Sequence, residues 1–165
     1  EIRLSLVGSE MCIRDRQSSR GVELAASLRV TPRLLAEGNF AYVDAQYDEF
    51  YENVGGRPVS RKGNRPTNTP DKVGNLWLTY DLAPSWQVGS DARYVSSMYA
   101  NAANSRYAPA YTIFGAFVGY QVNADTRITG RVRNLTDQVY ARTTAPSQLY
   151  LGAPRTFELA LQTRF

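Results

Sequence analysis

Strict alternation of apolar and polar residues runs through the last segment of the chain, from Arg155 to Phe165. Phe157, Leu159 and Leu161 fall on one face of that segment, and the residues between them fall on the other. A period of two residues predicts a β-strand whose sheet has one apolar and one polar face. Outer-membrane β-barrels finish on such a strand with an aromatic residue, so every other alternating segment becomes a candidate barrel strand.

The composition excludes several other classes of protein. The chain has 165 residues and a mean hydropathy of -0.38, and it contains no long apolar run, so no membrane-spanning helix is predicted. A spanning barrel remains compatible, because only alternate residues need to face lipid. The net charge of +4 is too small and too evenly spread to favour nucleic acid as a partner. With no His and one Cys, neither a Cys/His zinc cluster nor a His-based catalytic triad can form.

Residues 1–16, EIRLSLVGSEMCIRDR, resemble the translation of a sequencing adapter. We therefore expect this segment, including Cys12, to be non-native, and residues 17–165 to form the protein itself. The alternative is a genuine strand, since Ile2, Leu4 and Leu6 alternate. The segment is no signal peptide, because charged residues interrupt any apolar stretch. The expected location, the bacterial outer membrane, therefore depends on the barrel pattern alone.

Seven segments alternate well enough to predict strands, and the connections between them alternate in length. The predicted strands are 19–31, 34–46, 72–82, 86–98, 110–122, 127–135 and 155–165. Their connections run short, long, short, medium, short, long, and the long ones are rich in Gly and Pro. Outer-membrane barrels have tight periplasmic turns and longer outer loops, which predicts an all-β, antiparallel transmembrane barrel. Segment 110–122 is apolar on both faces, so its orientation stays open.

The predicted polar face indicates a wide barrel of which this chain is a part. Seven strands cannot close, because bacterial single-chain barrels have even strand numbers from eight upward. The polar face carries many charged groups, and such groups require water or partners. Its expected members are Glu23, Arg29, Glu37, Asn75, Asp81, Gln87, Asp91, Arg93, Arg127, Arg131, Arg133, Glu158 and Arg164. We expect a water-filled channel, or a plug that supplies counter-charges.

Four stretches, in order, carry a resemblance to a known family. They read SRGVE from Ser19, NLWLTY from Asn75, NLTDQVY from Asn134 and YLGAPR from Tyr150. Together they resemble the end of a TonB-dependent outer-membrane receptor, most closely of the ferric-siderophore class, with Thr136 where Phe is usual. The matching positions are Gly21, Glu23, Asn75, Trp77, Tyr80, Asn134, Leu135, Asp137, Tyr140, Gly152, Pro154 and Arg155.

The resemblance implies a 22-stranded barrel filled by an amino-terminal plug that lies outside this chain. It also implies binding of ferric siderophore at the outer loops and import energised by the TonB complex. The protein would be a transporter without a cofactor and not an enzyme. The barrel-assembly machinery would recognise the terminal strand, with Phe165 as its last contact, and the barrel would contact outer-membrane lipid and lipopolysaccharide.

Candidate ligand contacts lie in the long connection between the second and third predicted strands. Arg57, Arg61, Lys62 and Arg65 would attract an anionic ferric chelate. The alternatives are contact with lipopolysaccharide phosphates or an ordinary solvated loop. Five aromatic residues would form either a ligand platform or part of the interfacial girdle: Tyr47, Phe50, Tyr51, Tyr107 and Tyr111.

Two other functional classes are also compatible with the sequence. One is a different outer-membrane barrel: a TonB-dependent importer of cobalamin, haem or glycans, or a porin without a plug. The second is a soluble β-sheet binding module, which would have to pack its apolar face inward and fold in water without detergent.

Overall fold

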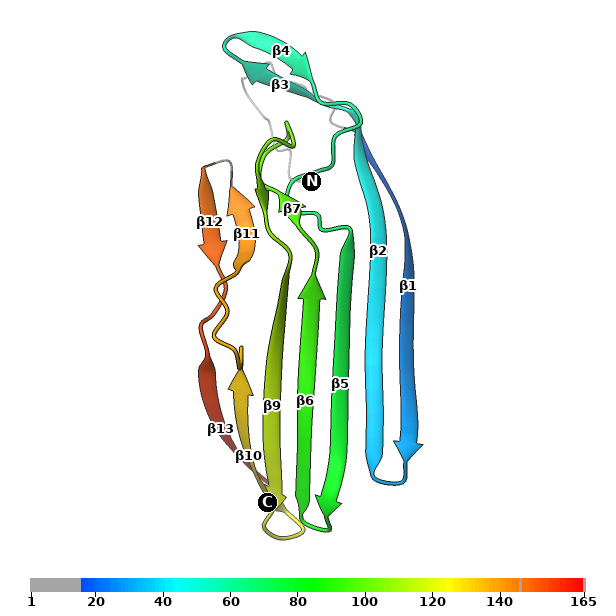
Figure 1. Ribbon diagram of the computed structural model, residues 1–165, viewed down its shortest axis with the longest axis vertical. Coiled ribbons are helices and arrows are strands. Elements are labelled where there is room, and N and C mark those ends of the chain that lie inside the picture. Colours follow the sequence, from blue (N-terminus) through cyan, green and yellow to red (C-terminus); the bar gives the residue numbers. More distant parts are fainter. Residues whose placement is uncertain (1–15, 146, 165) are drawn as a thin grey trace, which may run out of the picture.

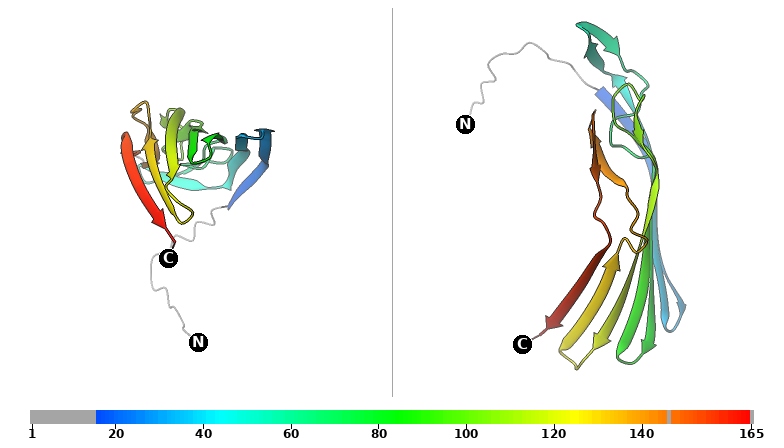
Figure 2. Two further views of the ribbon diagram at one scale, coloured as in Figure 1. Left: turned by 90° about the horizontal axis from the view of Figure 1, so that it is seen from below. Right: turned by 60° about the vertical axis from the view of Figure 1, so that its left-hand side comes forward.

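Seven long β-strands form one antiparallel sheet in the computed structural model, which describes residues 16–145 and 147–164. Neighbouring strands follow the order of the chain (Figure 1). They are β1 (Arg16–Thr31), β2 (Leu34–Glu49), β5 (Lys72–Ala83), β6 (Trp86–Val95), β9 (Tyr111–Gln121), β10 (Thr126–Arg133) and β13 (Thr156–Thr163). The sheet is curved like part of a cylinder wall (Figure 2), and β1 and β13 are its two edges.

Each of the three longer connections contains a short two-stranded hairpin, which the sequence pattern did not indicate. The hairpins are β3 (Tyr51–Val54) with β4 (Arg57–Ser60), β7 (Met98–Tyr99) with β8 (Tyr107–Ala108), and β11 (Ala141–Ala145) with β12 (Gln148–Leu151). The first turns at Gly55 and Gly56, with φ of 60° and 81°. Two successive residues with positive φ make the tight turn that matches the twist of a hairpin. These glycines therefore join two strands, where we had expected only a loop.

The seven predicted strands are confirmed, and β6 and β10 each end two or more residues earlier than expected for local reasons. β6 ends at Val95 because the Ser96 hydroxyl accepts hydrogen bonds from the backbone N–H groups of Asp71 (3.0 Å) and Lys72 (3.1 Å). A side chain thus occupies the place of a ladder carbonyl. β10 ends at Arg133 because Asn134 has a φ of 50°, which no strand residue adopts. Residues 1–15 and Phe165 lie outside the described residues, so the expectations for them stay predictions.

The strand register divides the sheet into one apolar and one polar face. Leu28, Ala36, Leu78, Ser90, Ala116, Val132 and Phe157 are successive cross-strand partners. This row crosses all seven strands, and the flanking rows on the same face are apolar as well. The register also resolves the open orientation of 110–122. Phe114, Val118 and Tyr120 lie on the apolar face, opposite Ala92, Val88 and Trp86.

No other element of the described chain covers the apolar face. Leu24 is 66% exposed and Leu159 is 82% exposed. The buried apolar cluster of Met98, Ala108 and Ala141 lies instead among the loops. Contiguous apolar surface of this extent marks contact with a membrane or a partner. No helix in residues 16–145 and 147–164 is long and apolar enough to cross a membrane.

The face assignment predicts different costs for one substitution at two adjacent positions of β1. Leu28 lies in the same cross-strand row as Ser90, which is midway between Trp86 and Tyr94 on β6. Leu28→Arg should therefore destabilise the full-length receptor by about 2–4 kcal/mol, the cost of a charge near the middle of the apolar band. Ser27→Arg should cost much less, because Ser27 lies on the polar face and its hydroxyl is 3.5 Å from the Glu37 carboxylate. Urea titration in lipid vesicles measures both costs. Equal losses of stability would show that the faces are wrongly assigned.

Candidate functional site

Three long connections gather at one end of the sheet, opposite the tight turns (Figure 1). They comprise residues 50–71, 96–110 and 134–155 and are called the outer loops below. Asn68, with a φ of 55°, connects all three. Its backbone N–H donates to the Tyr99 carbonyl (3.0 Å), and its side-chain amide donates to the Thr144 carbonyl (2.8 Å). Its amide oxygen accepts from the Thr144 N–H (2.7 Å) and hydroxyl (2.8 Å).

A second asparagine, Asn104, joins the first two outer loops, because its side-chain amide bonds both the backbone N–H and the carbonyl of one residue in the first loop. The Asn104 amide oxygen accepts from the Arg65 N–H (2.8 Å), and its NH₂ group donates to the Arg65 carbonyl (2.8 Å). Asn64 also donates to the Ala102 carbonyl (2.8 Å). Residues far apart in the chain are thus bonded to one another, and the outer loops form one packed unit.

Asp71 sits where this unit meets the sheet. A hydrogen bond with the Ser96 hydroxyl holds the pKa of the Asp71 carboxyl below its ordinary value. Partial burial opposes this shift, while the nearby charges of Lys72 and Arg65 reinforce it. The carboxylate therefore stays ionised across the neutral range, in contact with the Lys72 ammonium at 3.9 Å.

The four basic residues of the first outer loop fall into two kinds. Arg61 is paired with Glu52, its Nε and Nη2 each 2.7 Å from Oε2, and its side chain is 18% exposed. Arg65 donates to the Val43 carbonyl (3.1 Å) and lies 3.5 Å from Asp44. Arg57 and Lys62 are exposed. Two of the four therefore hold the loop together, and the ligand-binding role of the set stays a prediction.

The five aromatic residues proposed as a platform are also divided. Tyr47 stacks on Phe50 with ring centroids 4.6 Å apart. Tyr111 is buried and stacks on Tyr140 at 4.4 Å. Tyr51 and Tyr107 are exposed. The rings of Tyr51 and Tyr107 are therefore accessible and that of Tyr111 is not, and the platform role of the five residues stays a prediction.

The sequence signature after β10 forms a set of structural contacts. The Asn134 NH₂ group donates to the carbonyls of Gln138 (2.9 Å) and Ala153 (3.1 Å). The Asp137 carboxylate accepts from the Arg155 N–H at 2.8 Å. Gly152 lies under the Tyr140 ring, where a Cβ would overlap the ring atoms. These contacts bind the end of β10 to the start of β13, which explains why those residue types occur at those positions.

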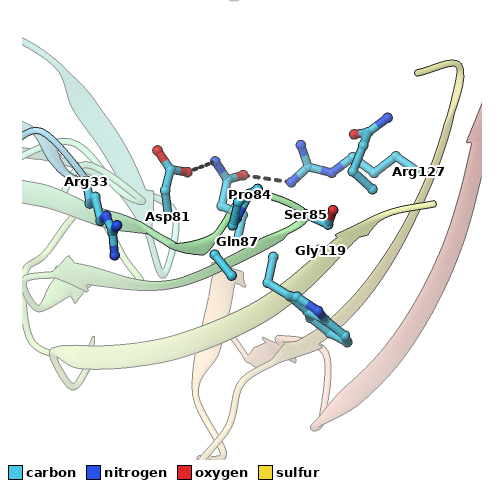
Figure 3. A pocket seen from close by; sticks show the side chains of 10 residues that line it. Arg33, Asp81, Pro84, Ser85, Gln87, Gly119 and Arg127 are labelled. Atoms are coloured by element: carbon cyan, nitrogen blue, oxygen red, sulfur yellow. Dashed lines mark hydrogen bonds between the residues drawn. The ribbon is translucent and has the colours of Figure 1, made fainter. Parts of the chain in front are cut away.

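The polar face carries hydrogen-bonded side chains that cross several strands (Figure 3). Gln87 donates to Asp81 (2.9 Å) and accepts from Arg127 (2.6 Å). Arg133 forms an ion pair with Glu158 at 2.6 Å. An open hollow of about 460 Å³ lies beside the first group, near the tight turn at 84–85. The predicted polar face is thus confirmed as one surface of the sheet.

The Asn68 contacts predict that one amide group controls the rigidity of the outer loops. Asn68→Asp keeps a residue that tolerates positive φ but loses the donor to Thr144. Loss of this hydrogen bond should speed hydrogen exchange at the Thr144 N–H by about tenfold in the full-length receptor. Asn53→Asp, on the exposed hairpin β3–β4, is the matched control and should leave that rate unchanged. An unaltered rate in Asn68→Asp would show that the loops are held together by other contacts.

Comparison with known proteins identifies the architecture. Residues 11–135 match the family model described as TonB dependent receptor-like, beta-barrel. The probable TonB-dependent siderophore receptor PiuA of Acinetobacter baumannii is 27% identical over 124 residues, covering 73% of this chain and 17% of that protein. The ferrioxamine B receptor of Salmonella typhimurium is 28% identical over 148 residues, covering 84% of this chain and 20% of that protein.

Solved structures show the same fold. The crystal structure of PiuA superposes with a TM-score of 0.81 at 24% identity, covering 90% of this chain and 22% of that one. The ferric citrate transporter FecA in its unliganded form gives a TM-score of 0.79 at 23% identity, covering 92% of this chain and 25% of that one. The chain spans about a fifth of the length of the curated relatives it matches. It belongs to the TonB-dependent receptor family of the bacterial outer membrane, and its open sheet is a segment of the receptor's β-barrel wall.

Proposed function

We propose that this chain is the carboxy-terminal part of the barrel of a receptor that imports ferric siderophores with energy from the TonB complex. The observation that carries the proposal is a two-faced wall of seven strands that supports a single packed unit of outer loops. The family match supports the barrel, and relatives named as siderophore, ferrichrome and ferrioxamine receptors support the ligand class.

Each surface of the chain would have a different role in such a receptor. The apolar face contacts lipid, while the polar face borders the interior of a 22-stranded barrel. The outer loops offer the surface that a ligand meets first. The plug and the segment that contacts TonB lie outside this chain, so the chain contributes the path and the outer surface, not the energy coupling. The activity is transport and involves no catalysis.

Exposed positive charge at the outer loops suits an anionic ferric chelate. Arg57 and Lys62 are the members of the predicted basic set that are free to meet solvent, because Arg61 and Arg65 hold contacts within the loop. Charge at such positions raises the local concentration of an oppositely charged ligand and its association rate.

Two further partners belong to the same proposal. The barrel-assembly machinery would recognise the last strand with Phe165, which lies outside the described residues. Lipopolysaccharide would surround the outer rim of the barrel. Deleting Phe165 should lower the amount of receptor in the outer membrane if this residue guides assembly. The amount should stay unchanged if Phe165 is an ordinary girdle residue.

The direct test of the proposed function is uptake by the full-length receptor. Cells that express it should accumulate iron-55 from at least one ferric siderophore in a panel, and accumulation should stop when TonB is deleted. Uptake of cobalamin, haem or a glycan in place of every siderophore would overturn the ligand class. Uptake that persists without TonB would indicate a porin.

The exposed basic residues predict a kinetic effect rather than a change in bound-state contacts. Arg57→Gln combined with Lys62→Gln should slow association with an anionic ferric siderophore several-fold at low salt, and less at physiological strength, where the Debye length is about 8 Å. Dissociation should hardly change. Stopped-flow fluorescence separates the two rates, and Arg33→Gln, at the opposite end of the sheet, serves as the control. Faster dissociation with an unchanged association rate would show direct contact with the ligand instead of steering.

A further inference from the structure

An open hollow lies at the end of the sheet opposite the outer loops, beside the tight turn between β5 and β6. Its volume is about 460 Å³, and small-molecule sites in proteins measure roughly 300–1,000 Å³. Its polar lining residues are Arg33, Asp81, Ser85, Gln87, Gln121 and Arg127. The hollow therefore has the size and the hydrogen-bonding groups of a site for a small polar ligand.

Arg127 is held in a fixed position at this hollow. Its guanidinium crosses β9 over Gly119 and donates to the Gln87 amide oxygen on β6 (2.6 Å), as Figure 3 shows. The absence of a side chain at Gly119 is required for this path, because a Cβ there would lie 2.5 Å from Arg127 Nη2. A guanidinium that is already fixed loses little further freedom when it binds an anion.

The charge at the hollow is positive and only partly balanced. Arg33 and Arg127 lie on opposite sides of Gln87 in Figure 3. Among residues 16–145 and 147–164, neither arginine has a carboxylate within ion-pair distance. Asp81 is the one carboxylate among the described lining residues, and its oxygen accepts a hydrogen bond from Gln87 Nε2 (2.9 Å). Two guanidinium groups against one carboxylate leave an excess of positive charge, and guanidinium groups bind anionic oxygens strongly.

We propose that this hollow is an exit site, which binds the anionic ferric chelate before the chelate is released at the end of the barrel opposite the outer loops. This inference rests on the proposed function, because it takes the cargo to be an anionic ferric siderophore. A site on a transport path must bind well enough to be entered and weakly enough to be left. Arg33 and Arg127 supply the attraction, while Asp81 and the open shape of the hollow keep the binding weak.

Fluorescence quenching in the purified full-length receptor tests for a bound chelate. A fluorophore is attached at Ala124→Cys, an exposed position on the next tight turn that lies outside the lining of this hollow. Ferric citrate, which is anionic, should quench the fluorophore saturably, and the neutral chelate ferrichrome should need about tenfold higher concentration. Equal quenching by both chelates, or quenching by ferric citrate that never saturates, would overturn the proposal. Sulfate at the same ionic strength should not abolish the quenching by ferric citrate; abolition would reduce the hollow to a general anion site.

Charge removal tests the two arginines. Arg33→Gln and Arg127→Gln should each weaken the binding of ferric citrate about tenfold, as expected from the loss of one charge-assisted hydrogen bond. Gly119→Ala, which displaces Arg127 without removing charge, should act in the same direction as Arg127→Gln. Arg29→Gln is the matched control, because Arg29 lies at the same end of the sheet but donates to the Pro32 carbonyl (3.2 Å) and is not a lining residue. Heat-modifiable migration in gels verifies that each variant is folded, and equal binding by all of them would overturn the assignment.

The same variants separate an exit site from a structural role of the arginines. In cells that express the full-length receptor, Arg33→Gln and Arg127→Gln should lower the maximal rate of iron-55 uptake several-fold. Association of the ligand at the outer loops should stay unchanged, because the hollow lies at the other end of the sheet. Conductance of the ligand-free receptor in planar bilayers should also stay unchanged. A raised conductance would show that the arginines hold another part of the receptor in place, and would overturn the proposal.

The outcomes also separate this inference from the proposed function. Quenching is measured without TonB and without uptake. A siderophore importer whose probe at Ala124→Cys is not quenched would keep its function and lose the exit site. If quenching is as expected and the receptor imports only haem or a glycan, the proposed function fails and the anion-binding hollow stands.

Discussion

Hydrogen bonding between neighbouring strands is the constraint on which the rest of this structure depends. Each ladder fixes which residues stand opposite one another, and a shift of one residue would send every side chain to the other face. The row from Leu28 to Phe157 crosses seven strands without a change of face. Because the register is kept across the sheet, one surface is continuously apolar while the other carries charge.

The same constraint explains where the chain departs from regular strands. Ser96 and Asn134 end two strands at the outer rim, one with a hydroxyl in place of a carbonyl and one with a positive φ. Beyond those points each loop has its own short hairpin ladder, and side-chain amides, chiefly those of Asn68 and Asn104, join the loops to one another. The wall is thus maintained by repeated backbone pairs, whereas the joining of the outer loops to one another depends on a few individual residues. Substitutions in the outer loops should therefore act more locally than those in the wall.

The parts that the sequence predicted are those governed by periodicity. Alternation in segments such as 155–164 is a local property, so strand positions and faces could be read directly. Segment 110–122 could not be oriented because both of its faces are apolar, and its Phe117 lies on the polar face, where it covers Gly89 of the neighbouring strand. The contacts of Asn68 join residues 76 positions apart, and no local pattern encodes such a distance. The available signal was weaker: asparagines within loops tolerate positive φ and pair with backbone groups.

The division of the basic loop residues shows why charge in a sequence is a weak guide to a binding site. Arg57, Arg61, Lys62 and Arg65 look alike in the chain, yet two of them are committed to neighbours. A guanidinium with five donors readily satisfies backbone carbonyls and carboxylates within its own loop. On the polar face the relation is reversed: Arg127 and Arg131 are held in place but lack a carboxylate among the described residues. Whether a cation has a counter-charge within its own segment is therefore decided by the fold and cannot be read from the run of basic residues in the sequence.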